Sequence, residues 1–159
     1  MKLFGLLIFL AFGIPAMRGV RWAYAAFVGL LLLSFPASMG FRLDPRPCEL
    51  MFDLRLAVQS LSNYAHITLF FFFFLMTAKQ LRMSGWQLWG WSFGLTMAMG
   101  AALEISQGLS GNHHCKTVDL IPDFIGAILG MIVLVLGRVL ASGRRNGANG
   151  NMRGNPPVD

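Results

Sequence analysis

Five polar side chains that can transfer protons or bind ligands lie at the ends of three apolar stretches of the sequence. His66 opens one stretch, Glu104 and Gln107 close the next, and Asp119 and Asp123 open the last. Glu104 and Gln107 are three residues apart. Asp119 and Asp123 are four apart, so the two members of each pair share a helix face. Because imidazole and carboxyl groups serve as general acids and bases, His66, Glu104 and Asp123 are candidate catalytic residues. Gln107 and Asp119 are candidate ligand-binding residues.

The stretches that carry these residues are too apolar for a soluble domain. Of the 159 residues, 55% are hydrophobic and only 13% are charged, whereas soluble domains have about 25% charged residues. A helix of about 20 apolar residues spans a bilayer, and apolar runs occur at 3–17, 22–41, 64–78, 86–105 and 120–140. The sequence predicts an all-α fold, a polytopic transmembrane helical bundle of about five spans, or four if the first run does not cross. It predicts one domain over residues 1–140 and a disordered cytoplasmic tail over 141–159.

The basic residues predict the orientation of these helices, because cytoplasmic loops carry the excess of Lys and Arg. Basic residues cluster at 18–21, 79–82 and 138–153. If all five runs cross the membrane, these three segments lie on the same side, as the charge rule requires. The C-terminus is then cytoplasmic, in a bacterial inner (plasma) membrane. The net charge of +6 reflects this topology and indicates no nucleic-acid partner. Six of the seven acidic residues fall on the outer side or in the outer half of a helix: Asp44, Glu49, Asp53, Glu104, Asp119 and Asp123.

The first apolar run has a second interpretation, as the core of a cleaved signal peptide, because it is short and follows Met1 and Lys2. Residues 14–17 make a poor cleavage site, since cleavage requires small residues at that point. Cleavage would also leave Arg18 and Arg21 on the outer side, against the charge rule. We therefore expect the run to be retained.

Two glycines continue the helix stripe that begins at Asp123. Gly126 and Gly130 are four residues apart, and small residues at this spacing let a neighbouring helix approach closely. We interpret both as helix-packing residues and expect the polar face of this helix to be its packed face. Asp119 has the alternative role of a simple helix cap after Thr117.

In their order and spacing, these residues resemble the VanZ-like family of integral membrane proteins. The family pattern is roughly D-K-x-x-H, then E-x-x-Q, then a loop Arg, then D-x-x-x-N-x-x-G-x-x-x-G. The resemblance covers about residues 60–135, and the matching positions are His66, Glu104, Gln107, Asp119, Gly126 and Gly130. It implies a bundle of membrane helices in the cell envelope. Because the family's namesake is associated with resistance to the glycopeptide teicoplanin, it also implies a link to antibiotic resistance.

The chain departs from that pattern at three places, which makes it resemble a divergent member. Ser62 and Asn63 stand where the family has Asp-Lys, and Asp123 stands where it has Asn. The loop Arg has no basic equivalent closer than His113 or Lys116. Arg presents a planar fork to anions that His cannot reproduce. We include His113 and Lys116 as candidate ligand-binding residues in its place.

Two cysteines, Cys48 and Cys115, fall in segments assigned to the outer side, where an oxidising compartment permits a disulfide. A Cys48–Cys115 bridge would cover the acidic residues, and two unrelated thiols are the alternative. His113, His114 and Cys115 are of the types that ligate transition metals, but adjacent His residues rarely bind one ion and no C-x-x-C spacing accompanies them. We expect no resident metal and no cofactor.

Three classes of function follow from these residues. In the preferred class the polar residues bind an envelope component, either a lipid-linked precursor or a glycopeptide ligand. In the second, the chain is a membrane enzyme acting on a lipid-linked phosphate or sugar, with Glu104 or Asp123 as general base and His66 as proton partner, with or without a divalent cation held by the acids. In the third, it is a structural accessory subunit with an unidentified membrane-protein partner, and the polar residues only join helices. The lipid bilayer is the partner common to all three.

Overall fold

The computed structural model describes residues 7–38, 54–110 and 117–152, and these residues are almost entirely helical. They contain no strand, in agreement with the expected all-α class. Short turns join several of the helices. In chain order the elements are the π-helix η1 (Phe9–Gly13), α2 (Ile14–Met17), α3 (Arg21–Ser38), α4 (Leu54–Ser60), α5 (Tyr64–Gln80), α6 (Gly85–Ser110), the 3-10 helix η2 (Thr117–Asp119) and α7 (Leu120–Met152).

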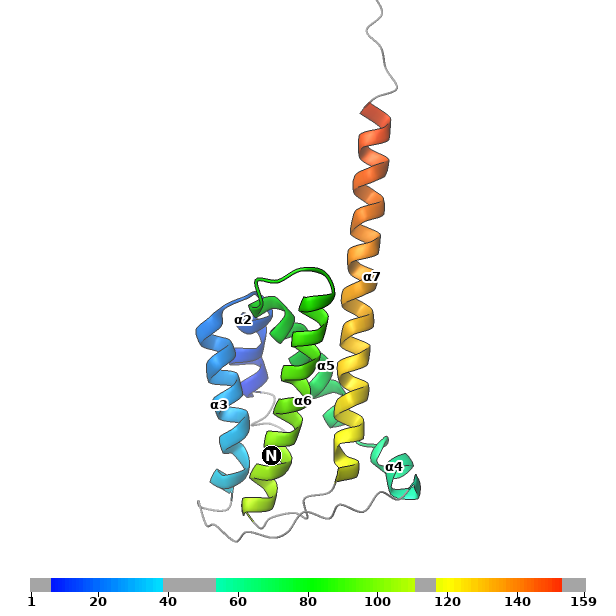
Figure 1. Cartoon of the computed structure of the whole chain (residues 1–159). Helices are drawn as coiled ribbons and strands as arrows, with labels where there is room; N and C mark the ends of the chain where they lie inside the picture. Colours follow the sequence, from blue (N-terminus) through cyan, green and yellow to red (C-terminus); the bar gives the residue numbers. More distant parts are fainter. Residues whose placement is uncertain (1–6, 39–53, 111–116, 153–159) are drawn as a thin grey trace, which may run out of the picture.

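Four long helices, α3, α5, α6 and α7, lie side by side and alternate in direction (Figure 1). We call one end of this bundle the lower end, after its place in Figure 1. There α6 finishes at Ser110, while α5 begins at Tyr64 and α7 at Leu120. The turns that join α2 to α3 and α5 to α6 lie at the opposite, upper end. Gly19 adopts a φ of 90°, which lets the chain reverse between α2 and α3 without steric cost.

Four of the five predicted runs correspond to long helices. The runs at 22–41, 64–78, 86–105 and 120–140 match α3, α5, α6 and α7, and each predicted start agrees with the observed one to within a residue. The described part of the first run is a π-helix followed by a single α-helical turn that ends at Met17. The helical content of the bundle was therefore predictable from the apolar runs.

The last helix, α7, is longer than the sequence predicted. Its backbone is helical to Met152, beyond residue 140, where the predicted apolar run ends. Figure 1 shows this extension projecting past the upper end of the bundle. Composition favoured disorder because Gly and Asn are poor helix formers. Extending an existing helix, however, needs no new nucleus, which is the costly step of helix formation.

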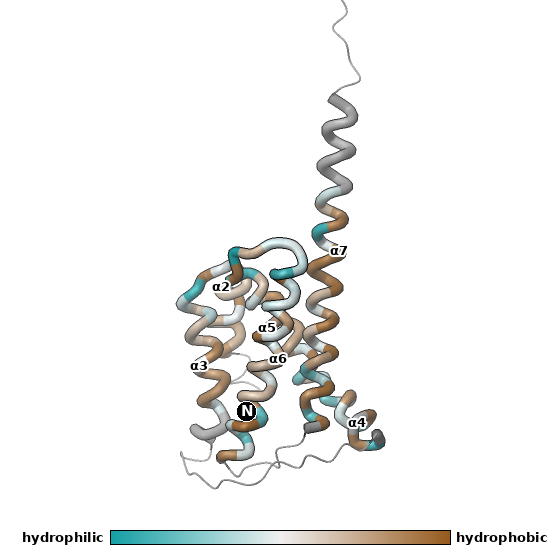
Figure 2. The backbone as a smooth tube through the Cα atoms, viewed as in Figure 1, coloured by the Kyte–Doolittle hydropathy of each residue, from teal (hydrophilic) through white to brown (hydrophobic). Residues whose placement is uncertain are grey.

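One helical segment among the described residues, Leu120–Ser142, is long and apolar enough to cross a membrane. Only 17% of an 18-residue apolar window of this segment is buried within the protein. Figure 2 shows its apolar character along much of α7. Exposed apolar surface of this kind normally contacts lipid or another protein. Large apolar side chains are exposed at Leu129, Ile132, Val133, Leu136, Val139 and Leu140.

The core is built around the aromatic side chains of α5. Phe70 and Phe73 are fully buried and pack with Phe27 of α3 and with Met99 and Leu103 of α6. The ring of Phe73 also lies against that of Tyr24, with centroids 5.8 Å apart. Because α5 contacts α2, α3, α6 and α7, it is the central helix of the bundle.

Gly126 and Gly130 lie where α7 approaches α5 most closely. A Cβ on Gly126 would collide with the carbonyl oxygen of Ile67 and lie 2.9 Å from the backbone nitrogen of Phe71. A Cβ on Gly130 would lie 2.9 Å from Cδ1 of Phe74. The glycines thus have the packing position that their spacing predicted, and they draw the start of α7 against the start of α5.

Candidate functional site

A direct contact between His66 and Asp123 joins the first turns of α5 and α7. Nδ1 of His66 lies 2.9 Å from Oδ1 of Asp123. The side chain of Asp123 is 1% exposed and that of His66 is 21% exposed. A carboxylate in this position fixes the orientation of an imidazole ring and leaves Nε2 as the nitrogen available to a ligand.

The local sequence explains how these two residues are positioned. Pro122 lies in the first turn of α7, where a missing N–H costs nothing because first-turn amides have no partner within the helix. Asp123 follows it in the same turn, and the helix dipole favours a carboxylate there. On α5, the ring of His66 stacks on Phe70 with centroids 6.2 Å apart and planes inclined by 28°. The imidazole is therefore held both at Nδ1 and on one face.

The second carboxylate oxygen of Asp123 lies against α6. Oδ2 is buried and has no hydrogen-bond partner among the described residues. A Cβ placed on Gly100 would lie 2.7 Å from this oxygen, so the carboxylate occupies space that only glycine leaves open. Gly100 is thus a site residue that the sequence reasoning missed. Its position four residues before Glu104 was the available signal.

Glu104 and Gln107 are buried on the face of α6 that also carries Gly100. They follow Gly100 by four and seven residues, the spacing of one helix stripe. An electrostatic interaction links Glu104 to His66. Toward the upper end the stripe continues with buried Thr96 and Ser92. The predicted polar face of α6 is therefore turned into the bundle.

Asp119 ends η2, one helical turn before Asp123, and is half-buried. Electrostatic interactions link it to both His66 and Asp123. The structure thus brings together one imidazole and three carboxyl groups from α5, α6 and the start of α7. We call His66, Glu104, Gln107, Asp119 and Asp123 the polar site.

Four other predicted residues fall outside the described part of the chain. They are His113 and Lys116, proposed as ligand-binding residues, and Cys48 and Cys115, proposed as a disulfide. The loop contribution to the site and the disulfide therefore stay predictions.

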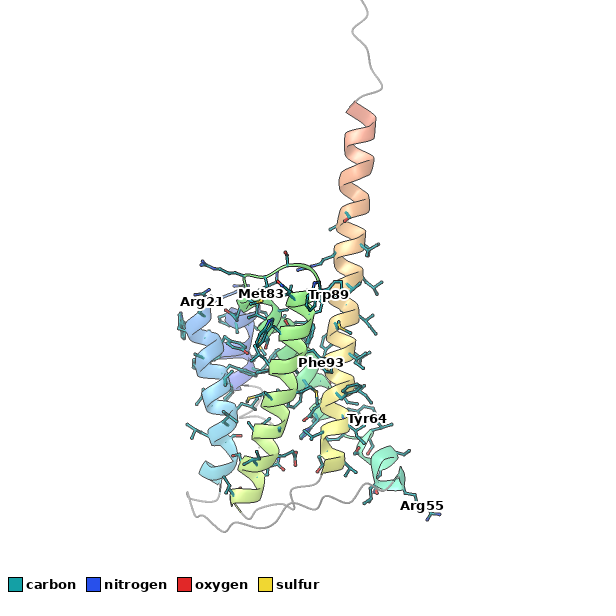
Figure 3. The ribbon with its side chains drawn as sticks, viewed as in Figure 1. Arg21, Arg55, Tyr64, Met83, Trp89 and Phe93 are labelled. Atoms are coloured by element: carbon teal, nitrogen blue, oxygen red, sulfur yellow. The ribbon has the colours of Figure 1, made fainter. Side chains whose placement is uncertain are left out.

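The described residues of the polar site carry more acidic than basic groups. Among the Lys and Arg residues of the described chain, Arg55 is the one at the lower end; it is exposed on α4 and directed away from the bundle (Figure 3). Figure 3 also shows Tyr64, the first residue of α5, at the lower end and Arg21 at the upper end. His66 is the basic side chain that the described residues place directly against these acids.

No group of three or more His, Cys, Asp or Glu with a metal-binding arrangement occurs within residues 7–38, 54–110 and 117–152. That set does not include His113, His114 or Cys115. The described chain thus gives no support to a divalent cation held by the acids.

No family model, curated protein or solved structure matches this chain. The polar site itself indicates what the described residues can do chemically. Its chemistry is that of an oriented imidazole, buried carboxyl groups and one amide, which can accept hydrogen bonds, exchange protons or bind a positive charge.

Proposed function

We propose that this chain is a VanZ-like multi-pass protein of the bacterial plasma membrane, with the lower end on the outer side and the C-terminus in the cytoplasm. The exposed apolar side chains of α7 support the membrane location, and the alternating directions of α3, α5, α6 and α7 support several crossings. Trp22 and Trp86 are exposed at the starts of α3 and α6, a position suited to the headgroup layer.

The polar site binds an envelope component from the outer side, either a lipid-linked saccharide precursor or a glycopeptide. The observation that carries this proposal is the His66–Asp123 pair, because charged side chains in apolar helices are costly and persist mainly where they serve a function. His66 and Asp119 are the more exposed members and contact the ligand. Asp123 and Glu104 lie behind them, where they orient the imidazole and add negative charge. Such a site suits hydroxyl, amide and amine donors, which saccharides and peptides carry.

Capture of the ligand tests this proposal. The full chain and its Glu104→Gln variant are extracted from bacterial membranes in nanodiscs, and the lipid-linked saccharides that co-purify are quantified by mass spectrometry, along with teicoplanin retained after it is added. We expect about ten-fold less ligand on the variant, a loss of about 1.4 kcal/mol, because Glu104→Gln removes the negative charge that Glu104 adds to the site behind His66.

The matched control is Lys79→Gln, which removes an exposed charge at the upper end. It should retain as much ligand as the unmodified chain. Equal retention by all three proteins would overturn the binding proposal. Loss of the Glu104→Gln protein from the membrane would instead favour the structural accessory class.

A second candidate function, proton-transfer catalysis on a lipid-linked phosphate or sugar, is favoured by the geometry of the same pair. Asp123 engages Nδ1 and holds the ring, so Nε2 of His66 is available as a general base. Asp123→Asn separates the two functions, because the amide can still hold the ring while the charge is removed. Binding should survive this change, whereas catalysis should fall by a factor of about 10⁴. The readout is the lipid-linked product formed by membranes that contain each variant.

A further inference from the structure

The buried carboxylate of Asp123 is only half satisfied by the protein. Oδ1 is 2.9 Å from Nδ1 of His66, whereas Oδ2 has no hydrogen-bond partner among the described residues, although the side chain is 1% exposed. Buried polar groups are nearly always paired, and an exception usually marks an unseen ion, proton or water. An ionised oxygen without a partner is especially costly in a bundle surrounded by lipid.

The described groups around Oδ2 do not supply a second positive charge. Gly100 of α6 has no side chain, and the next residue on the same stripe is another acid, Glu104. Asp119, one turn earlier on the α7 side, is a third acid linked electrostatically to Asp123. From α5 the facing group is His66, which carries at most one positive charge. Among the described residues, the titratable groups around Asp123 are thus three acids, counting Asp123 itself, and one imidazole.

The space at Oδ2 limits the size of an occupant. A Cβ on Gly100 would overlap with this oxygen, at 2.7 Å, and the side chain of Asp123 is 1% exposed where α7 packs on α5 and α6. A substituted ammonium group is too large for such a position. No metal-binding group of three or more His, Cys, Asp or Glu occurs among the described residues, so the strongly charged ligand set of a divalent cation is not provided there.

We propose that Oδ2 of Asp123 binds a monovalent cation, either Na⁺ or a proton, which Asp119 admits from the lower end and which the carboxyl group of Glu104 helps to retain. Asp119 suits the entry because it is half-buried and one turn nearer the end of the bundle. One protonated His66 balances the negative charge of one acid, and the cation neutralises the charge of a second. This inference rests on the same polar site as the proposed function, but it requires no envelope ligand.

The Na⁺ arm of the test is thermal unfolding of the purified full chain in detergent at fixed pH. NaCl is replaced stepwise by choline chloride at constant ionic strength. A ligand that binds only the folded state stabilises it in a saturable way, so the Tm should rise with Na⁺ by about 5 °C at saturation. Asp123→Asn should abolish the rise. Asp119→Asn, at a more exposed position, should shift the half-maximal Na⁺ concentration upward several-fold. Lys79→Gln should behave like the unmodified chain.

The proton arm uses infrared spectroscopy of the same proteins without Na⁺. A bound proton gives Asp123 the carbonyl band of a neutral carboxylic acid, and this band should be missing from Asp123→Asn and present in Lys79→Gln. A saturable Na⁺ effect, or this band, identifies the cation. The proposal is overturned if the Tm is independent of Na⁺ in every variant and no carboxylic acid band depends on Asp123. Because the samples contain no saccharide or glycopeptide, either result leaves the ligand-capture experiment to decide the proposed function separately.

Discussion

Gly126 of α7 lies directly against the backbone carbonyl of Ile67 on α5, the residue that follows His66. Asp123 is three residues before Gly126, so the same contact that brings the two backbones together also brings Asp123 within 2.9 Å of His66. The glycine stripe and the polar pair are therefore two parts of one helix interface. Close packing sets the geometry of the chemistry.

A side chain at Gly126 should separate α5 from α7. In Gly126→Ala the added Cβ meets the carbonyl of Ile67, and neither backbone can move aside without loss of packing. We expect a destabilisation of about 1–3 kcal/mol, measured by thermal unfolding in detergent, together with loss of ligand capture. Gly137→Ala is the control, because nothing lies within 4 Å of its added Cβ. Equal stability of the two variants would show that α5 and α7 do not touch at Gly126.

A methyl group at Gly100 should disturb the polar site more than the fold. The atom it meets is Oδ2 of Asp123, the end of a side chain that can swing away from α6. We expect the stability of Gly100→Ala to change by no more than about 1 kcal/mol, since Ala is the better helix former, while ligand capture falls at least ten-fold. Gly94→Ala, on the open face of the same helix, should leave both unchanged. Full ligand capture by Gly100→Ala would contradict the contact between α6 and Asp123.

The His66–Asp123 contact predicts a favourable coupling energy. His66→Gln and Asp123→Asn, alone and together, form a double-mutant cycle measured by reversible unfolding in mixed micelles. Because Asp123 is buried and the two atoms are within hydrogen-bond distance, we expect a coupling of about 1–3 kcal/mol. Additive effects of the two substitutions would mean that the side chains do not interact in the folded protein.

The proposed orientation predicts opposite results for reporter fusions at two positions. A periplasmic reporter enzyme fused after Ser110, at the lower end, should be active, and the same enzyme fused after Asp159 should be inactive. A fluorescent protein that folds only in the cytoplasm should give the reverse pattern. High periplasmic activity at Asp159 would invert the orientation and place the polar site on the cytoplasmic side.

Part of the polar site could be predicted from the sequence because charged residues are rare in the apolar runs. His66, Glu104 and Asp123 stand out against long apolar runs, and the spacing of Gly126 and Gly130 is a local property of one helix. The identity of the directly paired residues was not readable, because His66 could face either acid until the packing of α7 on α5 was known. The role of Gly100 could not be predicted for a similar reason, because it depends on which residue of α7 lies opposite.

The extent of α7 beyond the apolar run was not predictable from composition, for a different reason. Residues 141–152 are rich in Gly and Asn, and their composition favours disorder when they are considered alone. They follow an apolar helix that is already formed, and the observed backbone continues it to Met152. Composition describes a segment in isolation, whereas helix extension depends on what precedes the segment.

The continuity of α7 has a mechanical consequence. Asp123 lies in its first turn, and the helix then runs without interruption to Met152, a length of about 50 Å at 1.5 Å per residue. Gly126 and Gly130 pack against α5 close to one end of this long helix. A small tilt of α7 about these two contacts would therefore displace Met152 farther than it displaces Asp123.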